Sequence, residues 1–380
     1  MDLQYRTLKD GTKVSLLGMG IMRMPTEPTE DGGERPIQSL TDEMVKLAVE
    51  GGINYFDSAY VYNSGNNERA MGKALAPYRD QVMVATKLAM GYVHEYKDFM
   101  RQLDEQLDRL QMDYIDYYLM HNLGTKRLNT MLELGILKFL DEAKAQGKIR
   151  HAGFSCHNGF EGYKKTLDCY DWELTLVQYN ILDKHTQVGL KGLDYAYSKN
   201  VPVAIMEGLR GGDLVNPPQE ALDRYHKADA SRSIPQWGFR FVADHPAVKC
   251  ILSGMTSVEQ LKDNLSIFDS LPPAGSMTAE ESALYDDIRA IYTKRMRNTC
   301  TRCNYCQPCP KDVYIPGIFT SYNRSSMFDA FESAKADYTG ILKKGRGSDQ
   351  CVRCGLCETK CPQGVSIMED LQKAHEYFTK

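Results

Sequence analysis

The sequence predicts an α/β fold: a closed (β/α)8 barrel of the TIM type, followed by a small, mostly α-helical domain rich in cysteine. Three observations predict it. Eight short, β-rich apolar runs alternate with segments of helical period through roughly the first 275 residues, a length that fits such a barrel. No G-x-G-x-x-G opens the first helix, which disfavours a doubly wound open sheet. Eight of the eleven cysteines lie beyond residue 299.

The predicted strands are short runs rich in β-branched and aromatic residues. They cover residues 16–22, 54–58, 82–87, 114–121, 151–155, 175–179, 201–206 and 248–252. Segments with a helical pattern lie between them, for example 41–49 and 99–110. In the second of these, apolar residues recur at three- and four-residue spacing from Met100 to Leu110. That spacing places them on one face of a helix.

A turn-rich Leu-Pro-Pro-Ala-Gly-Ser stretch at 271–276 interrupts the alternation. We therefore expect the barrel to span residues 1–275 and a second domain to span residues 276–380. A helix over about 278–296 is expected to lead into the second domain. Because that domain is too small to depend on an apolar core, bound metal is expected to order it.

The cysteines beyond residue 299 form two runs of four, and each run ends in Cys-Pro. They are Cys300, Cys303, Cys306 and Cys309, then Cys351, Cys354, Cys357 and Cys361. The second run has the spacing of bacterial ferredoxins, in which the fourth cysteine binds the other of two 4Fe-4S clusters. Crossed ligation then assigns Cys361 to the cluster of the first run and Cys309 to the cluster of the second. We expect a ferredoxin-like domain with two 4Fe-4S clusters.

Structural zinc is the alternative, because repeated C-x2-C also suits tetrahedral zinc sites. Disulfides fit less well. The first residues form no apolar signal segment, so we expect the chain to stay in a reducing cytoplasm. No apolar run is long enough to span a membrane. A formal net charge of −4 gives no electrostatic reason to expect nucleic acid or an anionic membrane as partner.

Four polar residues stand at the ends of predicted strands or just after them: Asp57, Tyr62, Lys87 and His121. The active site of a barrel enzyme lies at the C-terminal ends of its strands. A carbonyl that accepts hydride becomes an alkoxide, which needs a proton donor and a nearby positive charge. A tyrosine phenol is a weak acid, but an adjacent ammonium favours its ionised form. Tyr62 would be the acid–base group and Lys87 its cation. Asp57 would hold Lys87, and His121 would orient the carbonyl oxygen.

With these four residues in place, roughly residues 1–270 resemble the aldo-keto reductase family. The resemblance implies reduction of an aldehyde or ketone, or oxidation of an alcohol, with NADP or NAD. It also implies the residues that bind this cofactor: Ser155, Gln178, Met206, Leu209, Gly212, Gly254, Thr256, Gln260 and Asn264. Three of them depart from the family pattern. Met206 replaces an aromatic that stacks on the nicotinamide. Gly254 and Gln260 replace basic residues, which leaves the choice between NADP and NAD open.

The run from Cys300 to Pro310 resembles that of bacterial and archaeal aldo-keto reductases with a C-terminal dicluster domain. A hydride carries two electrons and a cluster accepts one. The clusters would therefore be structural or serve an external electron carrier, or the barrel would draw on an electron source other than nicotinamide. The alternative to a carbonyl reductase is a nicotinamide-binding redox sensor or electron-transfer protein without carbonyl turnover. Variable loops build the pocket, so the sequence does not identify the substrate.

Overall fold

The computed structural model describes residues 3–302, 305–361 and 363–380. The chain folds into two compact units. One comprises residues 1–211 and 235–277, and the other comprises residues 212–234 and 278–380. The segment 212–234 therefore leaves the first unit after its seventh barrel strand and folds with the C-terminal part of the chain.

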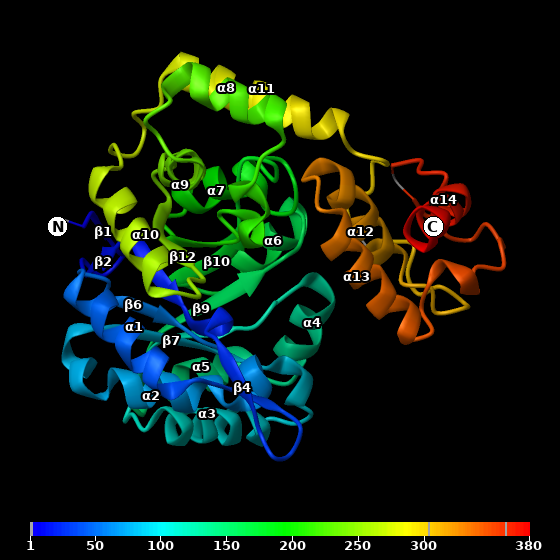
Figure 1. The fold of residues 1–380 in the computed structure, drawn as a ribbon. Coiled ribbons are helices and arrows are strands. Elements are labelled where there is room, and N and C mark those ends of the chain that lie inside the picture. The colour runs from blue at the N-terminus through cyan, green and yellow to red at the C-terminus, as the bar shows by residue number, and fades with distance from the viewer. Residues whose placement is uncertain (1–2, 303–304, 362) are drawn as a thin grey trace. The chain divides into compact units, whose positions relative to one another are not determined.

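Eight parallel strands close the first unit into a barrel, which confirms the predicted fold class (Figure 1). They are β3 (Leu17–Gly20), β6 (Tyr55–Asp57), β7 (Met83–Leu88), β8 (Ile115–Met120), β9 (Ile149–Cys156), β10 (Leu174–Gln178), β11 (Val203–Met206) and β12 (Val248–Ser253). β12 pairs with β3 and completes the ring. Each predicted run overlaps one of these strands. The first strand is shorter than predicted, because the chain turns into the 3-10 helix η1 (Ile21–Arg23).

Two antiparallel hairpins accompany the barrel. β1 (Tyr5–Thr7) pairs with β2 (Lys13–Ser15), and β4 (Thr26–Pro28) pairs with β5 (Glu34–Pro36). Leu8 and Val14 of the first hairpin join a buried cluster with residues from the barrel strands, such as Tyr55 and Leu174. Both of those residues begin their strands, so the first hairpin covers the end of the barrel that lies opposite the strands' C-terminal ends.

The described residues of the first unit form nine α-helices, which surround the barrel (Figure 1). They are α1 (Gln38–Glu50), α2 (Asn67–Leu75), α3 (Lys97–Leu110), α4 (Thr125–Glu133), α5 (Ile136–Ala145), α6 (Phe160–Leu167), α7 (Gly189–Ser198), α9 (Ile234–Ala243) and α10 (Val258–Ser270). The apolar stripe predicted from spacing forms the inner face of α3, where Phe99, Leu103 and Leu110 are buried. Short 3-10 helices connect several elements: η2 (Tyr62–Gly65), η3 (Ala76–Gln81), η4 (Met90–Tyr92) and η5 (Arg210–Val215).

The second unit is helical, and its described residues contain no strand. Its helices are α8 (Gln219–Asp229), α11 (Ala279–Lys294), α12 (Ile315–Met327), α13 (Phe331–Lys343) and α14 (Ile367–Thr379), with the short η6 (Ser348–Gln350). α8 packs along α11 (Figure 1). Ile318, Phe319, Tyr338 and Phe378 form a buried core among α12, α13 and α14. This core was not expected from the small size of the domain; it forms because three helices pack against one another. No helix in the described residues is long and apolar enough to cross a membrane.

Candidate active site

The four residues predicted to carry the chemistry lie close together. Asp57 ends β6, Lys87 lies one residue before the end of β7, and His121 directly follows β8, while Tyr62 begins η2. Lys87 Nζ donates to Asp57 Oδ1 at 2.5 Å and to the Ser58 backbone oxygen at 2.5 Å. The same nitrogen lies 5.0 Å from the centroid of the Tyr62 ring. The Tyr62 and His121 rings meet edge to face with 6.1 Å between centroids.

Burial and nearby charge decide the ionisation of Lys87 and His121. Asp57 and Lys87 are only 4% and 2% exposed. Burial by itself lowers the pKa of Lys87, but the charge of Asp57 and the neighbouring Tyr62 outweigh burial and raise that pKa above its ordinary value. Lys87 therefore remains an ammonium. Burial, assisted by the charge of Lys87, lowers the pKa of His121 to about 4, so its imidazole is neutral at neutral pH.

Ser155 and Gln178, which were matched to the nicotinamide amide, are buried near the C-terminal ends of β9 and β10. Ser155 Oγ accepts the backbone N–H of Asn122 at 2.8 Å. Gln178 Nε2 donates to Asp183 Oδ2 at 2.5 Å, and Gln178 Oε1 accepts from Gln187 Nε2 at 3.2 Å. Both side chains are therefore oriented by neighbours of their own chain.

The segment after β11 carries three more residues predicted to bind the cofactor. Met206 ends β11 and is partly buried. Leu209 packs on Gly238, where an added Cβ would require the Leu209 side chain to shift. Gly212 has a φ of +98°, a conformation that favours glycine. Gly212 belongs to the second compact unit, so the structure does not place it with Met206 and Leu209.

Arg23 places a cation near the predicted cofactor-binding loops, and this residue was not predicted from the sequence. It ends η1, directly after the first barrel strand, and its Nη1 donates to the Gly211 backbone oxygen at 2.8 Å. Its side chain also covers Gly254, where an added Cβ would lie 3.1 Å from Arg23 Cδ. Arg23 thus connects the loops after β11 and β12. Its signal in the sequence was only a basic residue shortly after a strand end.

The remaining predicted residues order the start of α10. The backbone N–H of Thr256 donates to Gln260 Oε1 at 2.8 Å, and the backbone N–H of Gln260 donates to Ser257 Oγ at 3.3 Å. Asn264 Nδ2 donates to Ser253 Oγ at 2.9 Å, which holds the helix to the end of β12. These polar contacts shape a helix N-terminus, where backbone amides favour anions.

The described cysteines of the two runs line two cavities within the second unit. Cys300, Cys306 and Cys361 line one cavity. The other is lined by Cys309, Cys351, Cys354 and Cys357, and also by Cys306. Cys303 lies outside the described residues. Cys361 therefore lies with the first run and Cys309 with the second, as crossed ligation requires; ligation itself stays a prediction. The described cysteines form no disulfide with one another.

Comparison with known proteins places this geometry in a family. Residues 16–279 match the sequence model of the aldo/keto reductase family. The chain belongs to this family. Residues 299–366 match the model of a 4Fe-4S dicluster domain. The protein is thus an oxidoreductase of the aldo/keto reductase family that carries a C-terminal dicluster domain.

Relatives of this aldo/keto reductase align with most of its barrel. The uncharacterised oxidoreductase YqkF of Bacillus subtilis is 27% identical over 281 residues, which cover 66% of this chain and 86% of YqkF. An NADH-specific methylglyoxal reductase of Escherichia coli is 25% identical over 295 residues, with coverage of 67% and 89%. An aldo/keto reductase of Klebsiella pneumoniae, solved with NADP and acetate, shares the fold with a TM-score of 0.62, 21% identity and coverage of 76% and 95%.

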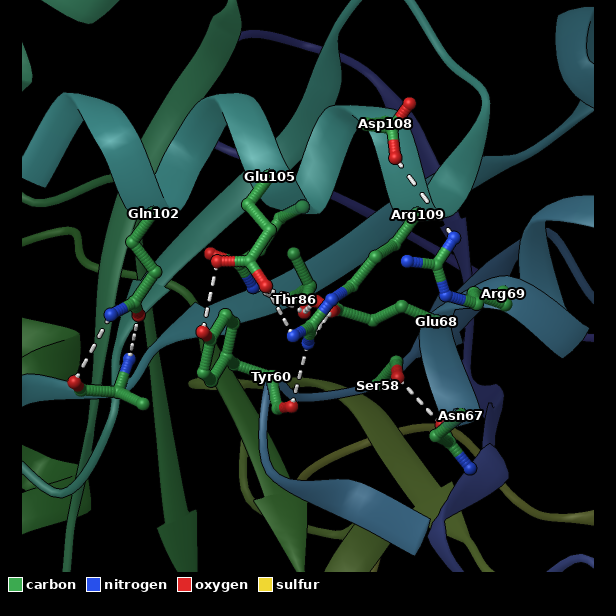
Figure 2. Close-up of polar contacts among 12 residues, drawn as sticks. Ser58, Tyr60, Asn67, Glu68, Arg69, Thr86, Gln102, Glu105, Asp108 and Arg109 are labelled. Carbon is green, nitrogen blue, oxygen red and sulfur yellow. Dashed lines mark hydrogen bonds and ion pairs between the residues drawn. The ribbon is translucent and has the colours of Figure 1, made fainter. Parts of the chain in front are cut away.

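A buried carboxylate supports the strand that carries Lys87 in this aldo/keto reductase (Figure 2). Glu68, near the start of α2, is fully buried. Its Oε1 accepts from Thr86 Oγ1 and from Gln106 Nε2, each at 2.5 Å, and its Oε2 accepts from Arg109 Nη1 at 3.2 Å. Gln106 also donates to the Lys87 backbone oxygen at 3.2 Å. The network therefore ties β7 to α2 and α3 next to the candidate active site.

Asn67, the residue before Glu68, holds the loops around Tyr62. Asn67 Oδ1 accepts the Ser58 hydroxyl at 2.6 Å (Figure 2). Asn67 Nδ2 donates to the Ile21 backbone oxygen at 3.0 Å and to Asn63 Oδ1 at 2.5 Å. Neither Asn67 nor Glu68 was predicted from the sequence, because two adjacent polar residues at the start of a helix are usually exposed.

We expect Glu68→Ala to lower the free energy of unfolding by about 3–5 kcal/mol, because it removes a buried carboxylate that accepts from Thr86, Gln106 and Arg109 at once. Glu105→Ala is the matched control. Glu105 pairs with the same Arg109, but its side chain is 36% exposed, so we expect a loss below about 1 kcal/mol. Urea unfolding of both variants measures the difference. Equal losses of unfolding free energy in the two variants would show that the buried carboxylate of Glu68 stabilises the protein no more than the exposed carboxylate of Glu105.

We expect stability to depend on His121 in mild acid. Between its ordinary pKa of 6.5 and the folded value of about 4, the unfolded chain binds a proton at His121 that the folded chain does not. Stability therefore falls as pH falls through this window. In His121→Gln the thermal midpoint should decline less steeply from about pH 6.5 to about pH 5. His226→Gln, at an exposed position, is the control. If the thermal midpoint declines equally steeply with falling pH in wild type and in His121→Gln, His121 does not contribute to the pH dependence of stability.

Proposed function

We propose that this aldo/keto reductase reduces an aldehyde or ketone with NADPH or NADH, or oxidises the corresponding alcohol, with Tyr62 as general acid–base. The observation that carries the proposal is the convergence of Tyr62, buried Lys87 and neutral His121 at the C-terminal end of the barrel. Nothing in a purely structural role requires a buried ammonium to face a partly exposed phenol.

Each side chain has a distinct role in this proposal. The nicotinamide, when bound, supplies the hydride. The Tyr62 hydroxyl gives its proton to the oxygen that becomes an alkoxide, and the Lys87 ammonium favours the phenolate that is left. Asp57 accepts from Lys87 and fixes its position. A neutral His121 can donate a hydrogen bond to the substrate oxygen without carrying a charge of its own.

The residues around Arg23 suit the anionic part of a dinucleotide. Arg23 lies against Gly211 and Gly254, and α10 begins just after Gly254 with the capping residue Ser257, so backbone amides at its N-terminus are available to an anion. Arg23 is also the cation that would offset Glu207, whose carboxylate lies beside Gly211 as Arg23 does. The relatives bind different cofactors by their descriptions, NADH in one and NADP in the other. We therefore propose NAD(P) and leave the preference to titration.

We propose that the second unit holds two 4Fe-4S clusters. The two cysteine-lined cavities support this, since one holds Cys361 with Cys300 and Cys306, and the other holds Cys309 with three cysteines of the second run and Cys306. A cluster is several ångströms across, so it needs thiolates spread around a cavity. Anaerobic purification with iron and sulfide counting tests the proposal; zinc without sulfide would refute it. Because such thiolates must remain reduced, we place the protein in the cytoplasm.

The reaction is tested by anaerobic oxidation of NADPH and NADH with a panel of aldehydes and ketones that includes methylglyoxal. We expect cofactor oxidation with at least one carbonyl compound. Tight cofactor binding without turnover on any substrate would instead favour the alternative, a nicotinamide-binding sensor or electron-transfer protein. Adding an external one-electron carrier to the same assay shows whether the clusters exchange electrons during turnover.

A further inference from the structure

The two cysteine cavities differ in how their surroundings meet solvent. Cys354 is exposed, whereas the other described cysteines of the two runs are partly buried. Two apolar neighbours in the same loop are also exposed, Val352 at 58% and Leu356 at 50%. Apolar side chains grouped at the surface next to a reactive centre are a common mark of a contact surface.

The cavities also differ in charge. Lys311, Arg353 and Lys360 line the cavity of Cys354, and no carboxylate is among its described lining residues. The described lining of the other cavity contains no charged residue. The three cations are exposed. Within the described residues none of them forms an ion pair, whereas the nearby Lys373 is paired with Glu369 and Asp370.

We propose that an acidic one-electron carrier protein docks on the surface formed by Val352, Leu356 and the three cations, and exchanges electrons with the cluster held by Cys309, Cys351, Cys354 and Cys357. One electron passes at a time: the reduced carrier becomes oxidised as the cluster becomes reduced, or the reverse. This inference rests on the two-cluster proposal. The apolar pair would supply contact area, and the cations would select a partner of opposite charge.

A simpler role for the cations must be separated from docking. A cluster with four thiolate ligands is an anion, and nearby cations stabilise its reduced form. Arg353 donates to Gln372 Oε1 at 3.1 Å, so it is held near the cavity by its own chain. If the cations only serve the cluster, reversing their charge will shift its reduction potential and leave carrier binding unchanged. If they form a docking surface, carrier binding will weaken and depend less on salt.

The test compares Arg353→Glu/Lys360→Glu with Lys343→Glu/Lys344→Glu, a matched double reversal at exposed positions of the same unit that line neither cavity. Anaerobic calorimetry with a flavodoxin and with a plant-type ferredoxin measures affinity for the full-length holoprotein. We expect the first variant to bind about ten-fold or more weakly than wild type and the second to bind like wild type. Val352→Ser/Leu356→Ser should weaken binding at high salt as well.

Equal affinity of wild type and Arg353→Glu/Lys360→Glu for both carriers would overturn the proposal, and so would equal losses in the two charge-reversal variants. Iron and sulfide are counted on every sample. A sample without sulfide refutes the clusters themselves, whereas a sample with full clusters but unchanged binding refutes only the docking surface. Reduction by photoreduced deazaflavin, a small neutral donor, should be the same in all variants if the substitutions act on docking.

Discussion

Replacing Tyr62 with phenylalanine is expected to lower kcat by about 10²- to 10⁴-fold on whichever carbonyl compound turns over fastest. The substitution removes the proposed proton donor and retains the ring that faces His121. Lys87 cannot take over, because Asp57 and the Ser58 carbonyl already hold its ammonium. Anaerobic initial rates measure the loss, and fluorescence titration should give an unchanged Kd for the nicotinamide cofactor.

Tyr60→Phe is the matched control for this experiment. Tyr60 lies two residues earlier, and its hydroxyl donates to Glu105 Oε2 at 2.9 Å, away from Lys87. We expect its kcat to stay within about two-fold of wild type, since no bond to the reacting atoms is lost. If Tyr62→Phe reduces every substrate at the wild-type rate, another group donates the proton and the catalytic assignment is wrong.

Removal of iron is expected to abolish the folding transition of the second unit while the barrel stays folded. The cysteine-bearing segments 305–314 and 346–361 contain only turns and the short helix η6. Their conformation therefore depends on ligation, and metal bound in small domains contributes on the order of 10 kcal/mol to folding. Calorimetry before and after anaerobic chelation should show one transition lost, and hydrogen exchange should show these segments fully exchanged.

A single-ligand substitution gives the same test without a chelator. Cys351→Ser should destabilise the second unit and lower the iron content. Cys169→Ser, at a partly buried cysteine of the first unit outside both runs, should change neither. Persistence of the second transition in iron-free protein would show that the apolar core among α12, α13 and α14 suffices for folding, and that the clusters are not structural.

Prediction from the sequence succeeded where local pattern decides structure. An apolar run such as 115–120 forms a strand wherever it is covered on both faces, and the C-terminal ends of parallel strands meet at one rim. Asp57, Lys87 and His121 could therefore be expected together from their positions alone. Cysteine spacing likewise indicated a dicluster domain, because three ligands of each cluster lie within a few residues of one another and the fourth cysteine of each run precedes a proline.

Residue patterns along the chain were enough to predict the barrel, the polar residues at its strand ends and the two cysteine runs. The folded structure was needed to show that Arg23 lies between two distant loops, that Glu68 is a buried acceptor beside β7, and that residues 212–234 fold with the second unit. The reason is physical. Spacing along the chain encodes periodicity, but hydrogen-bond partners separated by tens of residues meet only when the barrel closes and excludes water from between them.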